Sequence, residues 1–252
     1  MYQWRKKIVS WTSGRTLYLS IPFTWLLPEA EEMARSHHGP VIAGGPAVKL
    51  IPITWAKTPD LVPYDVLAFH NPCATFTSRG CPNHCPFCAV PIIEPIFQEY
   101  LVWKPAPLVC DNNLLACSKR HFRAVIKSLL QFPFVDFNQG LEATCLTEWH
   151  VNEFKMLRHV RMRFGFDEIQ EAKDVEKAID LCRHYGLNDI SVYCLIGFED
   201  TPALARQRLE MARSWGVAPV RHALSTIELP RQKQLCGRWL DRGGIEKGYE
   251  IL

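Results

Sequence analysis

The 252-residue chain lacks the features that mark membrane proteins and strongly basic nucleic-acid-binding proteins. It has no run of about 18 consecutive apolar residues, which a membrane-spanning helix needs. Its 29 Lys and Arg residues nearly balance its 26 Asp and Glu residues, so the formal charge is only +3. Internal repeats and low-complexity segments are also absent. We therefore expect a globular protein with no membrane partner and no strong nucleic-acid signal.

The first residues lack the pattern of a secretory signal peptide. The most apolar segment there, residues 17–27, is interrupted by Ser20 and Pro22 and is followed by an acidic run. A signal peptide has a longer apolar core and a small-residue cleavage site. We expect the protein to be cytoplasmic, where thiols stay reduced.

Cysteine is abundant, with ten residues in a chain longer than a disulfide scaffold. Seven cysteines are isolated in the sequence, and we expect them to be reduced, buried thiols that act as small hydrophobic residues. These seven are Cys73, Cys110, Cys117, Cys145, Cys182, Cys194 and Cys236. The remaining three, Cys81, Cys85 and Cys88, lie close together and carry the functional prediction.

Strand-like and helix-like segments alternate from residue 74 onward. The expected strands are residues 74–78, 107–111, 134–138, 160–166, 189–196 and 220–226. The expected helices are residues 119–130 after the N-cap Ser118, 148–157 after Thr147, 172–185 before Gly186, and 201–215 before Gly216. Short connections predict parallel strands joined by right-handed crossovers. Six strands predict an α/β fold with an open or partial barrel rather than the closed eight-stranded one.

The N-terminal region predicts a separate, short α/β extension. Strands are expected at residues 15–21 and 41–43, with a helix at 27–37 between them. The stretch 50–73 has several prolines and no clear period, which indicates a linker. The expected domains are therefore an extension with its linker at 1–73, a barrel at 74–226, and a C-terminal closing segment at 227–252.

The three clustered cysteines are spaced C-x3-C-x2-C in a loop after an expected strand. Thiolates this close together bind a soft metal centre in a reducing compartment. Three of them supply three of the four ligands of a 4Fe–4S cluster, and no fourth Cys follows at a ligand-like spacing. One iron would then be open to a non-protein ligand.

A zinc site and a cluster of structural thiols stay open as alternatives for this loop. A zinc site needs a fourth Cys or His, and His84 lies between two of the thiols. Structural thiols would belong to a core segment, whereas Gly80, Pro82 and Pro86 favour a loop.

The string Cys81-Pro82-Asn83-His84-Cys85-Pro86-Phe87-Cys88 resembles the signature of the radical S-adenosylmethionine (SAM) enzymes. The resemblance covers residues 74–226. It implies a partial (β/α)6 TIM-like barrel and a 4Fe–4S cluster whose open iron chelates the amino and carboxylate groups of SAM. It also implies that an electron from a donor such as flavodoxin or ferredoxin cleaves the sulfonium. The products are methionine and a 5′-deoxyadenosyl radical, which removes a hydrogen atom from the substrate.

The resemblance further implies which polar residues contact SAM. Asp111, Asn112 and Asn113 follow the second barrel strand, where the family carries a Gly-Gly-Glu motif that contacts the SAM amino group. They depart from that motif but offer carboxylate and carbonyl acceptors, and an Asx turn is the alternative. After the third strand, the amide of Gln139 would hydrogen-bond the ribose.

Arg163, in the fourth strand, would pair with the SAM carboxylate. An ion pair with Asp167 or Glu168 is the alternative. The order Arg-Met-Arg-Phe at 161–164 predicts that both arginines share one face of the strand, opposite a face that packs against helices.

Two residues would lie beside the adenine of SAM in this resemblance. Residues 192–199 resemble the Gly-x-Ile-x-Gly-x-x-Glu segment of the family without its first glycine, so Ile196 would pack on the ring. The backbone of Phe87 would lie next to it.

The N-terminal extension resembles the end of the cobalamin-binding domain found in one subgroup of these enzymes. The matching strings lie at 17–20, 23–25 and 44–47. The chain lacks the Asp-x-His-x-x-Gly string that supplies the lower ligand of cobalamin, and residues 1–50 are too few for a complete nucleotide pocket. We expect a truncated domain that covers the barrel and binds no cobalamin.

These observations predict a radical SAM enzyme with a 4Fe–4S cluster and SAM as its cofactors. The alternative from a different class is a non-catalytic or electron-transfer iron–sulfur protein that keeps the same fold. The substrate stays open between a small molecule and a macromolecule that docks at the barrel mouth.

Overall fold

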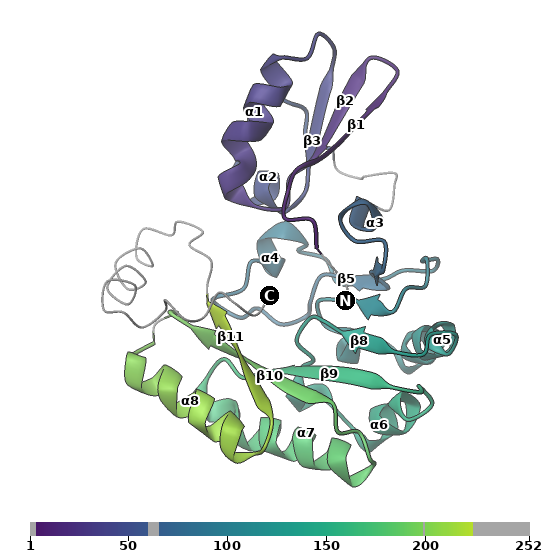
Figure 1. Cartoon of the computed structure of the whole chain (residues 1–252), viewed down its shortest axis with the longest axis vertical. Coiled ribbons are helices and arrows are strands. Elements are labelled where there is room, and N and C mark those ends of the chain that lie inside the picture. The colour runs from purple at the N-terminus through teal and green to yellow at the C-terminus, as the bar shows by residue number, and fades with distance from the viewer. Residues whose placement is uncertain (1–3, 60–65, 199, 224–252) are drawn as a thin grey trace. The chain divides into compact units, whose positions relative to one another are not determined.

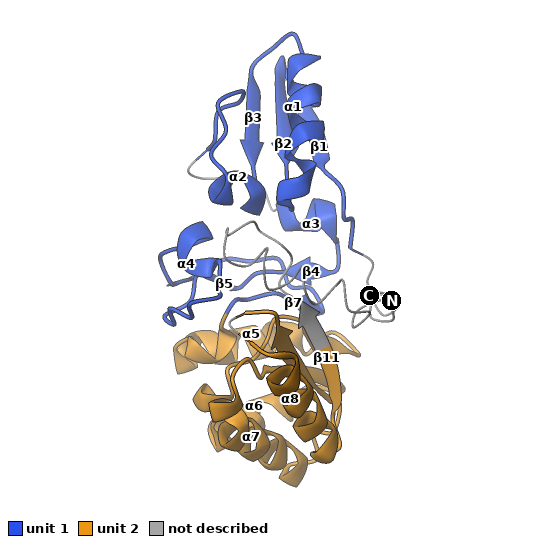
Figure 2. Cartoon of the chain, turned by 90° about the vertical axis from the view of Figure 1, so that its left-hand side faces the viewer, with its two compact units in different colours: residues 1–112 blue, residues 113–252 orange. Residues whose placement is uncertain are grey.

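The computed structural model describes residues 4–59, 66–198 and 200–223. The chain divides into two compact units, residues 1–112 and 113–252, which Figure 2 colours separately. The boundary falls within residues 74–226, the range expected to form one barrel. The expected closing segment, residues 227–252, lies outside the described residues.

Unit 1 begins with a small sheet and its covering helices. Strands β1 (Val9–Ser13), β2 (Thr16–Ser20) and β3 (Val41–Gly44) lie in the order β1-β2-β3, with β1 antiparallel and β3 parallel to β2. The helices here are η1 (Thr24–Leu26), α1 (Leu27–Arg35) and α2 (Pro46–Leu50). Leu19, Ile21 and Ala30 are among the buried residues of its core. The expected strands and the long helix are confirmed, and β1 was not predicted.

The second part of unit 1 is made of short elements. They are α3 (Val66–His70), β4 (Ala74–Thr75), β5 (Ser78–Arg79), α4 (Val90–Ile93), β6 (Gln98–Glu99) and β7 (Leu108–Val109). Strands β4 and β7 pair in parallel, whereas β5 and β6 are antiparallel. The single strand expected at 74–78 is therefore two strands. The strand is interrupted because the carboxylate of Asp111, rather than a neighbouring strand, binds the Thr77 N–H.

Unit 2 alternates helices with strands along the chain (Figure 1). Its strands are β8 (Val135–Phe137), β9 (Val160–Gly165), β10 (Ile190–Ile196) and β11 (Ala218–Ala223). Its helices are η2 (Leu114–Ala116), α5 (Lys119–Leu129), η3 (Ala143–Cys145), α6 (Glu148–Phe154), η4 (Ile169–Glu171), α7 (Ala172–His184) and α8 (Pro202–Ser214). The pairs β8–β9, β9–β10 and β10–β11 are all parallel. The α/β class is thus confirmed, while the described strands do not show a TIM-like barrel.

Polar caps fix the starts of two helices, at Ser118 as predicted and at Thr201, which was expected to be the first residue of its helix. The Ser118 hydroxyl accepts a hydrogen bond from the His121 N–H at 3.2 Å, at the start of α5. Thr201 does the same for the Leu204 N–H at 3.2 Å, at the start of α8. Helix α7 is followed by Gly186 in the left-handed region (φ +82°), a conformation that costs glycine little.

Strand β9 has two chemically different faces. Met162 and Phe164 are fully buried, and Met162 Sδ lies 4.0 Å from Cys182 Sγ of α7. Arg161 and Arg163 are half-buried on the opposite face. The predicted alternation is therefore confirmed, with the apolar face packed against a helix.

The isolated cysteines only partly follow the prediction. Cys110, Cys117, Cys182 and Cys194 are buried, as expected. Burial raises the pKa of Cys182 and of Cys194 to about 12, so both stay protonated at neutral pH. The prediction is wrong for Cys73 and Cys145, which retain partial exposure in irregular or short helical segments. The tenth cysteine, Cys236, lies outside the described residues.

Among the described helices, none combines the length and the apolar composition needed to cross a lipid bilayer.

Candidate functional site

The C-x3-C-x2-C motif lies just after β5, in a segment that we call the Cys loop (residues 80–94) and that ends just after α4. Cys81, Cys85 and Cys88 are thiols with partly exposed side chains. The Asn83 N–H donates to Cys81 Sγ at 3.4 Å, and the Val90 N–H donates to Cys88 Sγ at 3.4 Å. Backbone donors of this kind stabilise a thiolate over a thiol and tune a sulfur-ligated metal.

The three thiols are suitable ligands for a soft metal centre, although their sulfur atoms are not arranged around a common metal position. Within the described ranges, no three His, Cys, Asp or Glu side chains are arranged so as to hold a metal ion. Because ligand assembly and metal binding are coupled, the metal itself brings such side chains together. Three accessible thiols in one short loop, two with N–H donors on sulfur, have the chemistry that this coupling requires.

Glu94 joins the two ends of the Cys loop. Its Oε1 accepts from Arg79 Nε at 2.8 Å and also from Arg79 Nη2. Its Oε2 accepts from the Gly80 N–H at 3.2 Å and from Asn112 Nδ2 at 2.6 Å. Glu94, which follows Cys88 in the sequence, thus binds Arg79 and Gly80, which precede Cys81.

Gly80 is required at its position by backbone crowding. It adopts φ +73°, and a Cβ there would lie 2.3 Å from the carbonyl oxygen of Ile96. Any residue with a Cβ would combine left-handed strain with a clash against the backbone. The chain therefore enters the Cys loop through a turn that only glycine allows.

Asp111 is buried and binds the segment before the Cys loop. Its Oδ1 accepts from the Thr77 N–H at 2.6 Å, and its Oδ2 accepts from Ser78 Oγ at 2.9 Å and from Thr77 Oγ1. Burial raises the pKa of Asp111, while the hydrogen bonds from Thr77 and Ser78 act in the opposite direction. These partners give Asp111 a positioning role that the sequence did not predict.

The neighbours of Asp111 differ in their surroundings. Asn112 is half-buried and donates to Glu94, which leaves its amide oxygen as the acceptor for another group. Asn113 is buried. Phe87 is half-buried within the Cys loop itself. In unit 1 the carboxylate of Glu94 thus binds both Asn112 and the residues at the start of the Cys loop.

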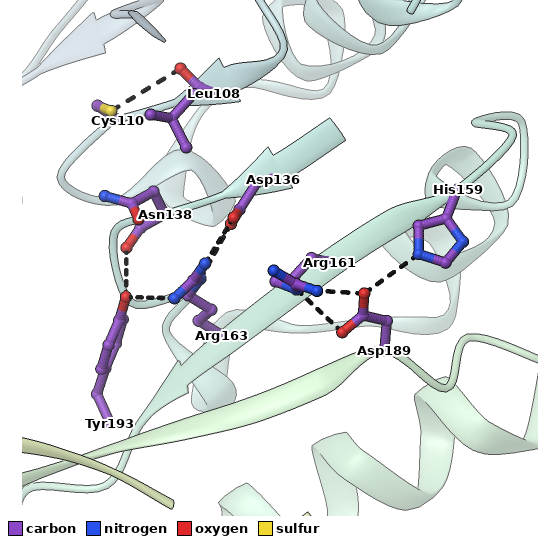
Figure 3. A network of polar contacts seen from close by, with 9 residues as sticks. All are labelled: Leu108, Cys110, Asp136, Asn138, His159, Arg161, Arg163, Asp189 and Tyr193. Atoms are coloured by element: carbon purple, nitrogen blue, oxygen red, sulfur yellow. Dashed lines mark hydrogen bonds and ion pairs between the residues drawn. The ribbon is translucent and has the colours of Figure 1, made fainter. Parts of the chain in front are cut away.

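In unit 2, Arg163 belongs to a polar network across three strands (Figure 3). Its Nε and Nη2 donate to the two oxygens of Asp136 at 2.9 and 2.5 Å. Its Nη1 donates to the Tyr193 hydroxyl at 3.0 Å, which in turn donates to the Asn138 carbonyl oxygen at 3.0 Å. The ion pair is well shielded, with side-chain exposures of 17% for Arg163 and 5% for Asp136.

Arg163 therefore forms an ion pair, as the alternative interpretation predicted, but the predicted partners were wrong. Asp136 on β8, not Asp167 or Glu168, binds the guanidinium. The only sequence signal for Asp136 was an acidic residue between two apolar ones in an expected strand. Arg161 shares the face of Arg163 but pairs with Asp189, a more exposed partner.

The remaining predicted contacts lie at the carboxyl ends of their strands. Gln139 is exposed just after β8. Ile196 is buried at the end of β10. Parallel sheets bind ligands at this end, so both positions are compatible with the predicted roles.

Sequence reasoning missed an acidic pair that follows β9. Burial and, second, the charge of Glu171 raise the pKa of Asp167 to about 7. Glu171 accepts N–H groups from Asp167 at 2.7 Å and Glu168 at 3.0 Å. With its pKa near 7, Asp167 is protonated in a large fraction of molecules at neutral pH.

No protein-family model, no curated protein and no solved structure matches this chain.

Proposed function

We propose that this chain is a radical SAM enzyme that binds a 4Fe–4S cluster through Cys81, Cys85 and Cys88. The observation that carries the proposal is the Cys loop, which presents three accessible thiols at C-x3-C-x2-C spacing. A cubane cluster held by three thiolates keeps one iron for an outside ligand. When bound and reduced, such a cluster supplies the electron that cleaves the sulfonium of SAM.

The residues around the cysteines support this chemistry. N–H donation to Cys81 Sγ and Cys88 Sγ stabilises the thiolates that the cluster needs. Asn112 offers its amide oxygen as an acceptor for the SAM amino group, because its amide nitrogen is bound to Glu94. Each of these groups is oriented by hydrogen bonds before any ligand arrives, which lowers the entropic cost of binding.

The SAM carboxylate would pair with Arg163. The guanidinium has five N–H donors, of which Asp136 and Tyr193 bind three. The bidentate Asp136 fixes the orientation of the guanidinium and leaves donors for a second anion. From the resemblance of the sequence, Ile196 and the backbone of Phe87 are the proposed contacts of the adenine, and Gln139 is the proposed contact of the ribose.

Electrons would come from a small redox protein of the cytoplasm, such as a flavodoxin or a ferredoxin. The proposed reaction consumes one electron from the donor protein and one hydrogen atom from the substrate. SAM and the electron give methionine and the 5′-deoxyadenosyl radical, which becomes 5′-deoxyadenosine on taking hydrogen from the substrate.

Metal and sulfide analysis of the anaerobically reconstituted protein tests the cluster. We expect about four irons and four sulfides per chain, and loss of the cluster in Cys81→Ala, Cys85→Ala and Cys88→Ala. The buried Cys110 and Cys182 provide matched controls, and their Ala variants should keep the cluster. A zinc ion with no sulfide, or a normal cluster in Cys85→Ala, would overturn the assignment.

A further inference from the structure

The Cys loop is closed by a side chain that the metal chemistry does not use. Glu94 follows Cys88 by six positions, and its carboxylate reaches back to Arg79 and Gly80, which precede Cys81. The ion pair with Arg79 is shielded from water, with side-chain exposures of 17% for Arg79 and 22% for Glu94. Two guanidinium donors bind one oxygen of Glu94, and a shielded pair of this kind is stronger than a surface ion pair.

The backbone reinforces this closure at the same place. Residues Ser78 and Arg79 of β5 pair with Glu99 and Gln98 of β6, just outside the Cys loop. The guanidinium of Arg79 also lies over the Phe76 ring, 3.7 Å from its centroid. Arg79 is therefore held by the strand pair, the aromatic ring and the carboxylate together.

Closing a loop before its ligand binds changes the cost of binding. A metal centre with three ligands in one loop must otherwise order that loop itself, and the lost chain entropy weakens the centre. With both ends already joined by Glu94, only the segment that carries the thiols is left to order. A preorganised loop should also reopen more slowly, which retards metal loss.

We propose that Glu94 is a positioning residue for the metal centre, acting through Arg79 and the Gly80 N–H to hold the Cys loop closed. The effect on the cluster rests on the proposed function, whereas the closure itself is a property of the chain without metal. The two parts can therefore fail separately.

Hydrogen exchange of the cluster-free chain tests the closure. In Glu94→Gln the charge is lost and one amide oxygen replaces two carboxylate oxygens, so the Gly80 amide should exchange about tenfold faster. Amides of β2 and β3 should exchange as in the parent. Glu29→Gln, which removes an exposed carboxylate from α1 of the same unit, should leave the Gly80 amide unchanged. Parent-like exchange of Gly80 in Glu94→Gln would overturn the inference.

Cluster lifetime tests the consequence. After reconstitution, iron loss to a chelator should be about tenfold faster in Glu94→Gln than in the parent, equivalent to about 1.4 kcal/mol, and unchanged in Glu29→Gln. Equal rates in Glu94→Gln and the parent would refute the positioning role. A parent that binds no cluster would instead refute the proposed function and leave the exchange result standing.

A second variant guards against misfolding of Glu94→Gln. Arg79→Lys keeps the positive charge but loses the planar fork that binds Glu94. We expect a smaller acceleration of both Gly80 exchange and iron loss. Acceleration of neither in a folded Arg79→Lys protein would contradict the proposal.

Discussion

Several carboxylates that looked unremarkable in the sequence orient the polar groups of this protein. Glu94 holds Arg79, Gly80 and Asn112, and Asp136 holds Arg163. In each case a half-buried or buried acid accepts two or more charged or backbone donors. Such bonds are costly to break, because the remaining partner would be left buried and unpaired.

Replacement of Asp136 should show this cost. Asp136→Ala leaves the shielded guanidinium of Arg163 without its bidentate partner, and we expect a loss of about 3 kcal/mol in unfolding free energy. Asp189→Ala removes the corresponding partner of the more exposed Arg161 and should cost under about 1 kcal/mol. Urea unfolding measures both, and equal losses would contradict the difference in shielding.

The proposed contact between Arg163 and the SAM carboxylate can be tested by substitution. Arg163→Lys keeps the charge but not the planar fork, so loss of a charge-assisted bond should weaken SAM binding by roughly 10- to 150-fold. Titration of SAM into the reduced, reconstituted protein, followed by paramagnetic resonance of the cluster, gives the midpoint. Arg161→Lys is the matched control on the same strand face. If Arg163→Lys had the same titration midpoint as the parent at equal cluster content, Arg163 would not be a ligand of the SAM carboxylate.

The raised pKa of Asp167 predicts a pH-dependent stability. The pKa of Asp167 is raised from 3.8 to about 7 by burial and by Glu171, so between these values the folded state binds a proton that the unfolded state has released. Stability contributed by this group is therefore complete below about pH 4 and is lost as the pH rises to about 7.

Asp167→Asn should abolish this dependence. Relative to the variant, we expect the parent to lose about 2 kcal/mol of unfolding free energy between pH 5 and pH 8, measured by urea unfolding. Asp180→Asn, at an exposed position of α7, should not reproduce the change. A constant difference between the parent and Asp167→Asn over this range would show that Asp167 is ionised throughout.

Among the elements, the turn into the Cys loop has the strictest backbone requirement. Gly80→Ala places a methyl group 2.3 Å from the Ile96 carbonyl oxygen at φ +73°, so β5 and β6 must separate. Gly14 shares the left-handed backbone (φ +58°) but has open space around it. We expect Gly14→Ala to cost about 1 kcal/mol and Gly80→Ala clearly more, in thermal unfolding. Equal costs would show that the Gly80 turn relaxes freely.

Local sequence patterns predicted most elements of unit 2, because their ends are set by neighbouring residues. Ser118 and Thr201 cap helices through N–H groups three positions away. The division of the expected strand 74–78 could not be predicted in this way. Its cause, the bond from the Thr77 N–H to Asp111, spans 34 positions of sequence.

For the whole molecule, the sequence predicted the α/β class, and the cysteine spacing located the candidate metal loop. The partner of Arg163 was not predictable, since two acids closer in sequence competed with Asp136, 27 positions away. Glu94 was missed for the same reason, because its role depends on a loop that brings distant positions together. Local chemistry could thus be deduced from spacing, whereas the supporting contacts depend on the folded chain.

If the Cys loop binds a cluster that cleaves SAM, as we propose, the products of SAM cleavage can be measured. The anaerobically reconstituted protein, reduced in the presence of SAM, should release 5′-deoxyadenosine and methionine in equal amounts. Cys85→Ala protein and unreduced protein should release neither. A parent that carries about four irons per chain but releases no 5′-deoxyadenosine on reduction would contradict the account and favour an electron-transfer or non-catalytic iron–sulfur protein.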